Sequence, residues 1–478
     1  MTDTLNVFRH LTLFDWTVFA GVLLVTLTAV IFGNLRRRRM ADHSAEADLL
    51  DLLLMGRRLT LPLFTATLVA TWYGGIFSVT EYAHEVGIYN WLTQGVFWYA
   101  AYLIFAFALV KRIRTSEART MPELLGGMFG PRSATLGAWL NLLNVLPVTY
   151  LLMLGIFLQL IFGGSLLLWM ALGIAVVAGY STLGGFRSVV FSDLVQFTVM
   201  CSSVVLVIVF SMTRFGGIGW LRAHPEIPAG HWKPLGDGIP LSLTLVWGFL
   251  ALGTLVDPNF YQRCLAAKDV RTARRGILLA TGIWICFDFC TTFGALYARA
   301  ALPAAEPRSA YLLYSLQLLP AGLRGFFLAG ILATILSTLD SYLFLSGTLV
   351  AYDLAPVHRR GRLRYHHVGT LLMAITALAA AALFQLSGEN LVGIWKFFGG
   401  YATACILIPL LSGYIWPGKI PDRTFVTACC SGIILMTLFH LFRARTPLAE
   451  VEPFYFGLLG TLPPLLLRIP LNRPTAVG

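Results

Sequence analysis

A polar stripe interrupts one of the most apolar segments of this sequence. The stretch ILATILSTLDSYLFLSG (residues 331–347) places Thr334, Ser337, Thr338 and Ser341 at positions i, i+3, i+4 and i+7, with Asp340 beside them. Residues with this spacing share one face of an α-helix. Hydroxyl and carboxylate oxygens suit small hard cations, so the stripe predicts a sodium site. The alternative is that these hydroxyl groups bond to their own helix or mediate helix packing.

Further charged side chains lie inside apolar segments. An aspartate at the centre of a membrane-spanning helix costs roughly 2.5–3.5 kcal/mol, so Asp340 is expected to face protein or water. Asp193 follows a Gly-Gly turn in GGFRSVVFSDLVQF (residues 184–197). We interpret it either as a site residue near the cytoplasmic mouth or as a solvated cap or partner of Arg187. Asp288 has no partner that the sequence identifies.

A glycine pair interrupts a third segment, LVATWYGGIFSVTEY (residues 68–82). Gly74 and Gly75 weaken a continuous helix and let its backbone bend. Unwound backbone at membrane depth is tolerated where it lines a cavity, and its free carbonyl groups then coordinate cations. The alternative is close packing of two helices. In DPNFYQRCLAAKD (residues 257–269), Pro258 is expected to break a helix, and the stretch alone is typical of an ordinary helix end.

The composition indicates which elements carry these residues. The chain has 478 residues, 57% of them hydrophobic and 12% charged, with mean hydropathy +0.75. Soluble proteins contain about 25% charged residues. We predict an all-α polytopic membrane protein with about 13 transmembrane helices, because the apolar runs have the length that crosses a bilayer. The predicted spans are Trp16–Leu35, Leu61–Ala83, Trp91–Val110, Ala134–Phe162, Leu166–Tyr180, Val189–Met212, Leu241–Tyr261, Ile277–Ala298, Phe326–Val350, Val368–Leu386, Leu391–Trp416, Phe425–Phe442 and Phe454–Leu467.

The basic residues indicate the orientation of these spans. Four basic clusters stand out: Arg36–Arg39, Lys111–Arg114, Gln262–Arg275 and His358–Arg364. If the spans alternate, all four clusters fall on one side, which the positive-inside rule makes cytoplasmic. We therefore predict a multi-pass protein of the cell (plasma) membrane with its N-terminus outside and its C-terminus in the cytoplasm. This topology accounts for the net charge of +12, so no nucleic-acid partner is expected.

Other kinds of chemistry lack their usual patterns. The seven cysteines form no CxxC pair or zinc-ligand array, so we expect no disulfide and no metal cluster. The sequence contains no GxxxxGK[ST] motif for ATP-driven transport. No His/Asp/Glu cluster or Ser-His-Asp pattern indicates an enzyme, and no cofactor is expected.

Taken together, these segments resemble the sodium:solute symporter family, the relatives of sodium/proline, sodium/pantothenate and sodium/glucose cotransporters. The similar motifs are LLLMGRRL (52–59), RTMPELLGGMFG (119–130), GGFRSVVFSDLVQF, DPNFYQR and STLDSYLFLSG. The resemblance implies a LeuT-like core built from a 5+5 inverted repeat. The implied parts are an N-terminal helix with a basic loop (1–60), the first repeat (61–212), an external loop (213–240), the second repeat (241–416) and C-terminal helices (417–478).

The resemblance also implies ligands for the coupling ion, Na⁺. The first sodium would be held by backbone carbonyl groups of Ala70, Tyr73 and Thr334 and by the hydroxyl groups of Ser337 and Thr338. Some members hold a second sodium, and the matching positions are Asp193, Ser337, Asp340 and Ser341. Two carboxylates in one place repel, so one of them would bind a proton in the absence of a cation.

The same resemblance places the solute beside the broken helix, at Trp72, Gly74 and Gly75. Trp72 stands where the sodium/proline branch has an Asp, which disfavours proline and offers an apolar or stacking wall. The implied function is a secondary active transporter that imports a small organic solute with sodium by alternating access. Its partners would be that solute, Na⁺ and the lipid bilayer. Two alternatives remain open: proton-coupled symport on the same fold, with Asp193 or Asp340 as carrier, and a transporter-like solute sensor.

Overall fold

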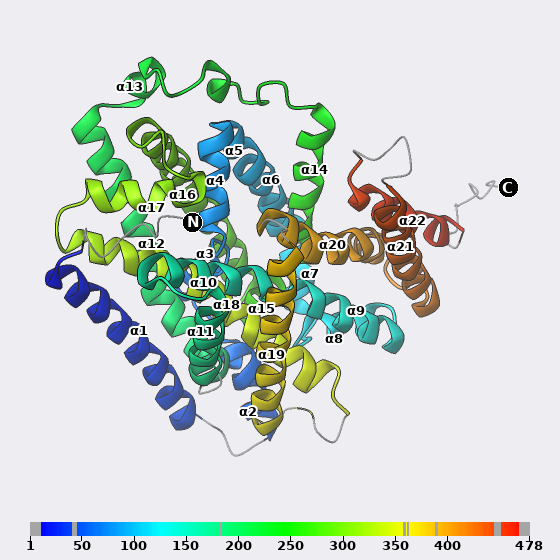
Figure 1. Ribbon diagram of the computed structural model, residues 1–478. Coiled ribbons are helices and arrows are strands. Elements are labelled where there is room, and N and C mark those ends of the chain that lie inside the picture. The colour runs from blue at the N-terminus through cyan, green and yellow to red at the C-terminus, as the bar shows by residue number, and fades with distance from the viewer. Residues whose placement is uncertain are drawn as a thin grey trace.

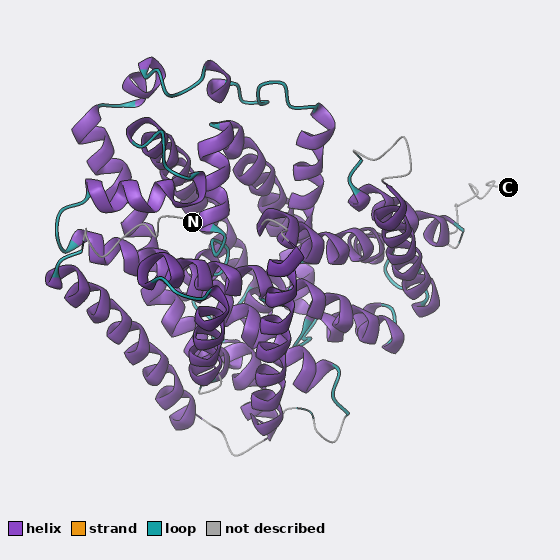
Figure 2. Ribbon diagram, viewed as in Figure 1, coloured by secondary structure: helices purple, strands orange, loops and turns teal. Residues whose placement is uncertain are grey.

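The structure is a computed structural model that describes residues 11–40, 45–181, 184–356, 360, 363–387, 391–443 and 451–467. In these residues every regular element is helical, and one isolated bridge joins Leu59 to Ala267. Figures 1 and 2 show the helices packed around a common centre, with the connection that contains α13 (Ile218–Ala223) passing over one end. The basic cluster predicted at His358–Arg364 lies largely outside the described residues.

The helices follow the predicted apolar segments. In the described part, ten helices are long and apolar enough to cross a membrane, and three shorter apolar helices are α3 (Leu61–Ala70), α11 (Leu166–Ser181) and α22 (Pro453–Leu466). The polytopic all-α architecture is confirmed, whereas the number of spans stays a prediction. Other helices are α1 (Leu13–Met40), α2 (Ala45–Leu54), α4 (Ile76–Val86), α6 (Phe97–Ile104), α7 (Val110–Thr115), α8 (Met121–Met128), α9 (Pro131–Asn144), α10 (Val148–Phe162), α12 (Gly185–Phe215), α14 (Leu241–Ala251), α15 (Pro258–Ala266), α16 (Val270–Ala301), α17 (Pro307–Leu318), α18 (Leu323–Thr348), α19 (Leu363–Ser387), α20 (Leu391–Ile415) and α21 (Asp422–Phe442).

Helix α18, which carries the polar stripe, lies at the centre of the molecule. It packs against α1, α10, α11, α12 and α19, and it also meets α3 and α4. In its most apolar window 94% of the residues are buried inside the protein. Because protein rather than lipid surrounds this helix, its hydroxyl and carboxylate groups find polar partners and avoid the cost of exposure to lipid.

Two predicted spans are broken in the middle. Helix α3 ends at Ala70 and α4 begins at Ile76, so the intervening residues, which include the glycine pair, are not helical. The second break separates α14 from α15, where a 3₁₀ turn (Leu252–Val256) precedes Pro258. A further break, which the sequence did not predict, lies between α9 and α10. It replaces the continuous span expected at Ala134–Phe162, because Pro147 lacks the N–H that a continuous helix needs.

Candidate functional site

The break between α3 and α4 lies directly against α18. The carbonyl oxygen of Ala70, the last residue of α3, accepts a hydrogen bond of 2.7 Å from the hydroxyl of Ser337. A Cβ atom added at Gly74 would come within 2.6 Å of the Cβ and Oγ1 atoms of Thr338. Tyr73 lies in the same break. The structure therefore brings together the glycine-containing segment and the hydroxyl stripe, as the sequence predicted.

The hydroxyl groups of the stripe also bond to their own helix. Ser337 donates to the carbonyl of Ala333 at 2.8 Å, and Thr338 donates to the carbonyl of Thr334 at 3.2 Å. The alternative interpretation of the stripe, in which its hydroxyl groups satisfy the helix backbone, is thus present as well. It does not account for the contact with Ala70, whose carbonyl lies at a helix end and lacks an intrahelical donor.

A buried arginine lies one helical turn away from this contact. It bonds to Thr67, which precedes Ala70 on α3, and to Ser341, which follows Ser337 on α18. Arg263 of α15 is 0% exposed. Its Nη2 atom donates to the hydroxyl oxygens of Ser341 at 2.9 Å and Thr67 at 3.3 Å, and it lies 3.7 Å from Oδ2 of Asp193. Thr67 also donates a hydrogen bond to Asp193. One guanidinium therefore connects residues of α3, α12 and α18.

The four residues predicted for a second cation site divide into three groups. Ser337 belongs to the contact between α18 and the end of α3. Asp193 and Ser341 share the buried arginine. Asp340 accepts a hydrogen bond from Ser181 at the end of α11. The second set of residues is therefore close to the first, but a guanidinium already stands between two of its members.

Two interpretations of charged residues are corrected here. Asp193 is 0% exposed, so it is not a solvated helix cap, and Arg187 pairs with Asp51 rather than with Asp193. Arg263 was counted with the basic cluster Gln262–Arg275 expected at the cytoplasmic surface, yet it is fully buried. One signal for this burial is present in the sequence, because the three residues after Arg263 (CLA) are apolar or small, and all three are buried as well.

The cluster around the arginine carries more negative than positive charge. Arg263 interacts electrostatically with three carboxylates, Asp193, Asp257 and Asp340. Asp257 also accepts hydrogen bonds from two backbone N–H groups at the start of α15, which compensate part of its charge. Asp340 has the hydroxyl of Ser181 as its neutral partner. Asp340 is thus the carboxylate of this cluster whose charge is least compensated.

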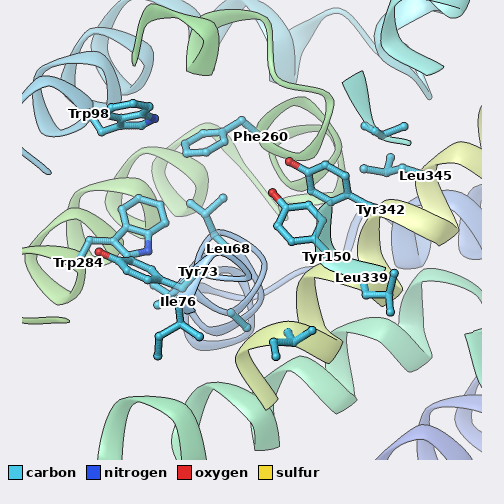
Figure 3. Packing of buried hydrophobic residues seen from close by; sticks show 14 of the residues in the cluster. Leu68, Tyr73, Ile76, Trp98, Tyr150, Phe260, Trp284, Leu339, Tyr342 and Leu345 are labelled. Atoms are coloured by element: carbon cyan, nitrogen blue, oxygen red, sulfur yellow. The ribbon is translucent and has the colours of Figure 1, made fainter. Parts of the chain in front are cut away.

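A cavity with aromatic walls lies beside the break. Of the three residues expected beside the solute, Trp72 and Gly75 line this cavity, whereas Gly74 packs against α18 and is not among the lining residues. The cavity has a volume of about 140 Å³, which suits a small solute. Figure 3 shows Tyr150 and Tyr342, whose ring centroids are 4.9 Å apart, with their hydroxyl groups pointing the same way. Lining residues that the sequence did not assign to the cavity include Trp98, Tyr150, Trp247, Asp257, Asp288 and Tyr342.

A histidine joins the connection between α12 and α14 to the helix that follows the break, α4. His231 contacts the carbonyl of His84 through Nε2 at 3.2 Å, and its own carbonyl accepts a hydrogen bond from the backbone N–H of Ile88 at 2.9 Å. Burial lowers the pKa of the His231 imidazole below its ordinary value, although the contact with His84 acts in the opposite direction. Burial thus favours the neutral imidazole, which can still donate from Nε2 to the carbonyl of His84.

Comparison with known proteins gives a consistent result. Residues 54–419 match the family model described as the sodium:solute symporter family. The chain is 25% identical over 398 residues to the sodium/pantothenate symporter of Escherichia coli, covering 79% of this chain and 77% of that protein. It is also 25% identical to the sodium/glucose cotransporter of Vibrio parahaemolyticus (72% and 69%) and 23% identical to sodium/myo-inositol cotransporter 2 of Rattus norvegicus (73% and 59%).

Solved structures show the same fold. The structure of the substrate-bound outward-open state of a Na⁺-coupled sialic acid symporter superposes with a TM-score of 0.74 at 16% identity, covering 96% of this chain and 97% of that one. A nucleobase-cation-symport-1 family transporter in a closed conformation gives a TM-score of 0.55 at 14% identity, covering 86% and 91%. These likenesses confirm the predicted LeuT-like fold.

Proposed function

Since the chain belongs to the sodium:solute symporter family and carries out sodium-coupled symport of a small solute, we propose that its coupling ion binds where the end of α3 meets α18. The ligands are the carbonyl oxygens of Ala70, Tyr73 and Thr334 and the hydroxyl oxygens of Ser337 and Thr338. The single observation that carries this proposal is the 2.7 Å approach of the Ser337 hydroxyl to the Ala70 carbonyl, which joins two separate helices.

The chemistry of these atoms suits sodium. All five are neutral oxygens, and hard cations prefer oxygen ligands. A carbonyl at a helix end carries the negative end of the helix dipole, which favours a cation. When an ion binds, the hydroxyl groups direct their lone pairs to it and turn their intact O–H bonds toward other acceptors, so the ion holds α3 against α18 more firmly than one hydrogen bond does.

Coupling follows from this placement. An ion that binds one arrangement of two helices better than another shifts the equilibrium toward the first arrangement. Trp72 and Gly75 belong to the same break and line the cavity. Sodium therefore orders the wall of the solute site, and the solute in turn increases sodium affinity by the same factor. The membrane potential adds about 2.3 kcal/mol per charge for each 100 mV.

A second cation, if one is used, binds at Asp340. Asp193 already has Arg263 as its counter-ion, whereas Asp340 has a neutral partner. Either Na⁺ or a proton at Asp340 would neutralise the one carboxylate of the cluster whose immediate partner is a neutral hydroxyl. This observation keeps proton coupling as the second candidate, with Asp340 rather than Asp193 as the carrier.

The organisation into repeats is part of the same proposal. The first repeat, 61–212, and the second, 241–416, each begin with a broken helix, α3–α4 and α14–α15. The two breaks meet at the cavity, which both Trp72 and Asp257 line. We retain the predicted orientation, with the N-terminus outside a cell membrane and the C-terminus in the cytoplasm.

Sodium titration of purified protein tests the site. Tryptophan fluorescence is followed while NaCl replaces KCl at constant ionic strength. Loss of one neutral ligand removes about 0.5–1.5 kcal/mol, so Ser337→Ala and Thr338→Ala should raise the half-saturating sodium concentration about 2- to 10-fold. Ser346→Ala is the matched control, because Ser346 is a buried serine of α18 that bonds to its own helix at 3.0 Å. If the control and the two site variants respond alike, the assignment fails.

Transport itself is measured with the protein in liposomes at fixed pH. Uptake that requires an inward sodium gradient supports sodium coupling. Uptake that ignores sodium but follows a pH gradient, and that Asp340→Asn abolishes, would instead establish the proton-coupled alternative.

A further inference from the structure

Asp288 is a buried carboxylate that the sodium site does not use. It lies on α16 and lines the cavity, and the residue is 3% exposed. The hydroxyl of Tyr99 donates a hydrogen bond to Oδ2, and the indole N–H of Trp91 in turn donates to Tyr99 at 3.1 Å. Among the ion pairs within 4.0 Å in the described residues, none includes Asp288. Its only assigned partner is thus a neutral hydroxyl.

The described residues that line the cavity include acidic but no basic side chains. Two carboxylates line it, Asp257 and Asp288, and none of the described lining residues is Lys, Arg or His. Asp257 is compensated by two backbone N–H groups at the start of α15 and by the nearby guanidinium of Arg263. Asp288 has no comparable compensation. Among the described lining residues, no cationic side chain therefore balances Asp288.

The walls of the cavity that Asp288 lines are aromatic. Trp98 lies 6.3 Å from Trp247 between ring centroids, and Trp72 lies 6.0 Å from Tyr102. These four rings all line the cavity. Cations within about 6 Å of a ring centroid are attracted to the ring face, and aromatic cages are the usual binding sites of quaternary ammonium groups. Rings and an uncompensated carboxylate together favour a cation that is poorly hydrated.

We propose that the transported solute carries an ammonium group, either a protonated amine or a quaternary ammonium, and that Asp288 is its counter-ion. This inference rests on the proposed transport function and names the substrate class of that site. An anionic solute would meet two carboxylates and, among the described lining residues, no basic group. A neutral solute would supply no counter-ion, so Asp288 would have to bind a proton to avoid the cost of an unpaired buried charge. The ammonium group occurs both in simple cations and in zwitterions such as betaines and amino acids, and the experiment separates the two.

A purely structural role of Asp288 predicts a different outcome. If the carboxylate only oriented Tyr99 and Trp91, an amide of the same shape would accept the same hydrogen bond. Asp288→Asn therefore keeps the hydrogen bond and removes the charge. Tyr99→Phe does the reverse, since it removes the hydrogen bond and keeps the charge. Asp269→Asn is the matched control, because Asp269 is the exposed N-cap of the same helix and Asn is an equally good cap.

The experiment measures binding to purified full-length protein by calorimetry, in NaCl and in KCl. The probes are choline as a simple cation, glycine betaine and proline as zwitterions, glucose as a neutral solute and pantothenate as an anion. We expect sodium-dependent binding of at least one ammonium compound and none of glucose or pantothenate. Asp288→Asn should weaken that binding roughly 10- to 100-fold, whereas Tyr99→Phe and Asp269→Asn should change it less than about 3-fold. Choline binding identifies a free cation, and binding of a zwitterion alone identifies a zwitterionic solute.

A sodium titration without solute accompanies every variant. It reports whether Asp288→Asn is folded, because its sodium response should equal that of the unmodified protein. Sodium binding combined with glucose or pantothenate binding, or with no binding of any ammonium probe, overturns the ammonium assignment and leaves the sodium site intact. Equal affinity of Asp288→Asn and the unmodified protein for the ammonium probe overturns it as well. If the unmodified protein shows no sodium response, the proposed function fails and this inference fails with it.

Discussion

The approach of Gly74 to α18 makes a sharp prediction about sodium affinity. In Gly74→Ala the added Cβ atom would lie 2.6 Å from the Cβ and Oγ1 atoms of Thr338 and 2.6 Å from Cδ1 of Tyr150. Ordinary contacts begin at 3.4 Å, so the break must retreat from α18 by about 0.8 Å. Thr338 cannot absorb this shift by rotation, because its Cβ atom is fixed to the backbone of a buried helix.

The size of the effect follows from this displacement. Overpacking of a dense core costs typically 1–3 kcal/mol. The sodium-bound state requires the closest approach of α3 and α18, so we expect it to bear most of this cost. The sodium affinity should then fall about 5- to 100-fold. Gly75→Ala is the control, because its Cβ atom would meet only Met153 at 3.9 Å. Gly75 has φ −87°, so alanine adopts that backbone without strain.

Sodium titrations of the two variants, with their thermal stabilities in KCl, decide the matter. We expect Gly74→Ala to need far more sodium than Gly75→Ala and the unmodified protein. Similar sodium affinities for all three proteins would refute the argument that the ion bridges the break and α18. A weaker affinity in Gly75→Ala than in Gly74→Ala would refute it equally.

Three further predictions concern other charged groups. Arg263→Met leaves Asp193 buried without its counter-ion, which costs about 3–5 kcal/mol when one partner of a buried pair is removed, and a large fall in melting temperature would show this. Asp340→Asn should flatten the dependence of sodium affinity on pH between pH 5 and 8, measured by the same titration, if Asp340 exchanges a proton for an ion. For His231, the folded-state pKa lies below the unfolded value, so the unfolded state takes up the proton first and stability is lost as the pH falls below about 6.5. His231→Gln should reduce the difference in melting temperature between pH 7.5 and 5.5.

The sequence was sufficient for the fold class, whereas the contact between α3 and α18 was implied by the resemblance to the family. Apolar runs of membrane-spanning length predict helices directly, because the bilayer leaves the backbone few alternatives. The glycine pair at residues 74–75 and the spacing of Ser337 and Thr338 are local patterns, so they can be recognised without a structure. The apolar run through Pro147 predicts one continuous span, whereas the structure has a break before Val148.

The partners of the buried charges were harder to predict. Arg263 stands in a basic stretch whose other members suit a cytoplasmic loop, and only the tertiary fold buries it beside Asp193. The pairing of Arg187 with Asp51 joins residues 136 positions apart. Such contacts depend on how helices distant in the sequence are arranged. Asp288 was noted as an intramembrane charge, but its place in the cavity follows from the packing of α16 against α6 and from the break in α14–α15.

The proposed sodium site and the arginine cluster are mechanically linked by the two helices that they share. On α3, Thr67 contacts Arg263 and Asp193, and Ala70 follows one turn later at the proposed sodium site. On α18, Ser337 contacts Ala70, and Ser341, one turn on, contacts Arg263. Any movement that separates the end of α3 from α18 must therefore also strain the contacts of the guanidinium. We infer that loss of sodium weakens the ion pair between Arg263 and Asp193. The helices around the ion site and those around the buried charges would then separate together rather than one after the other.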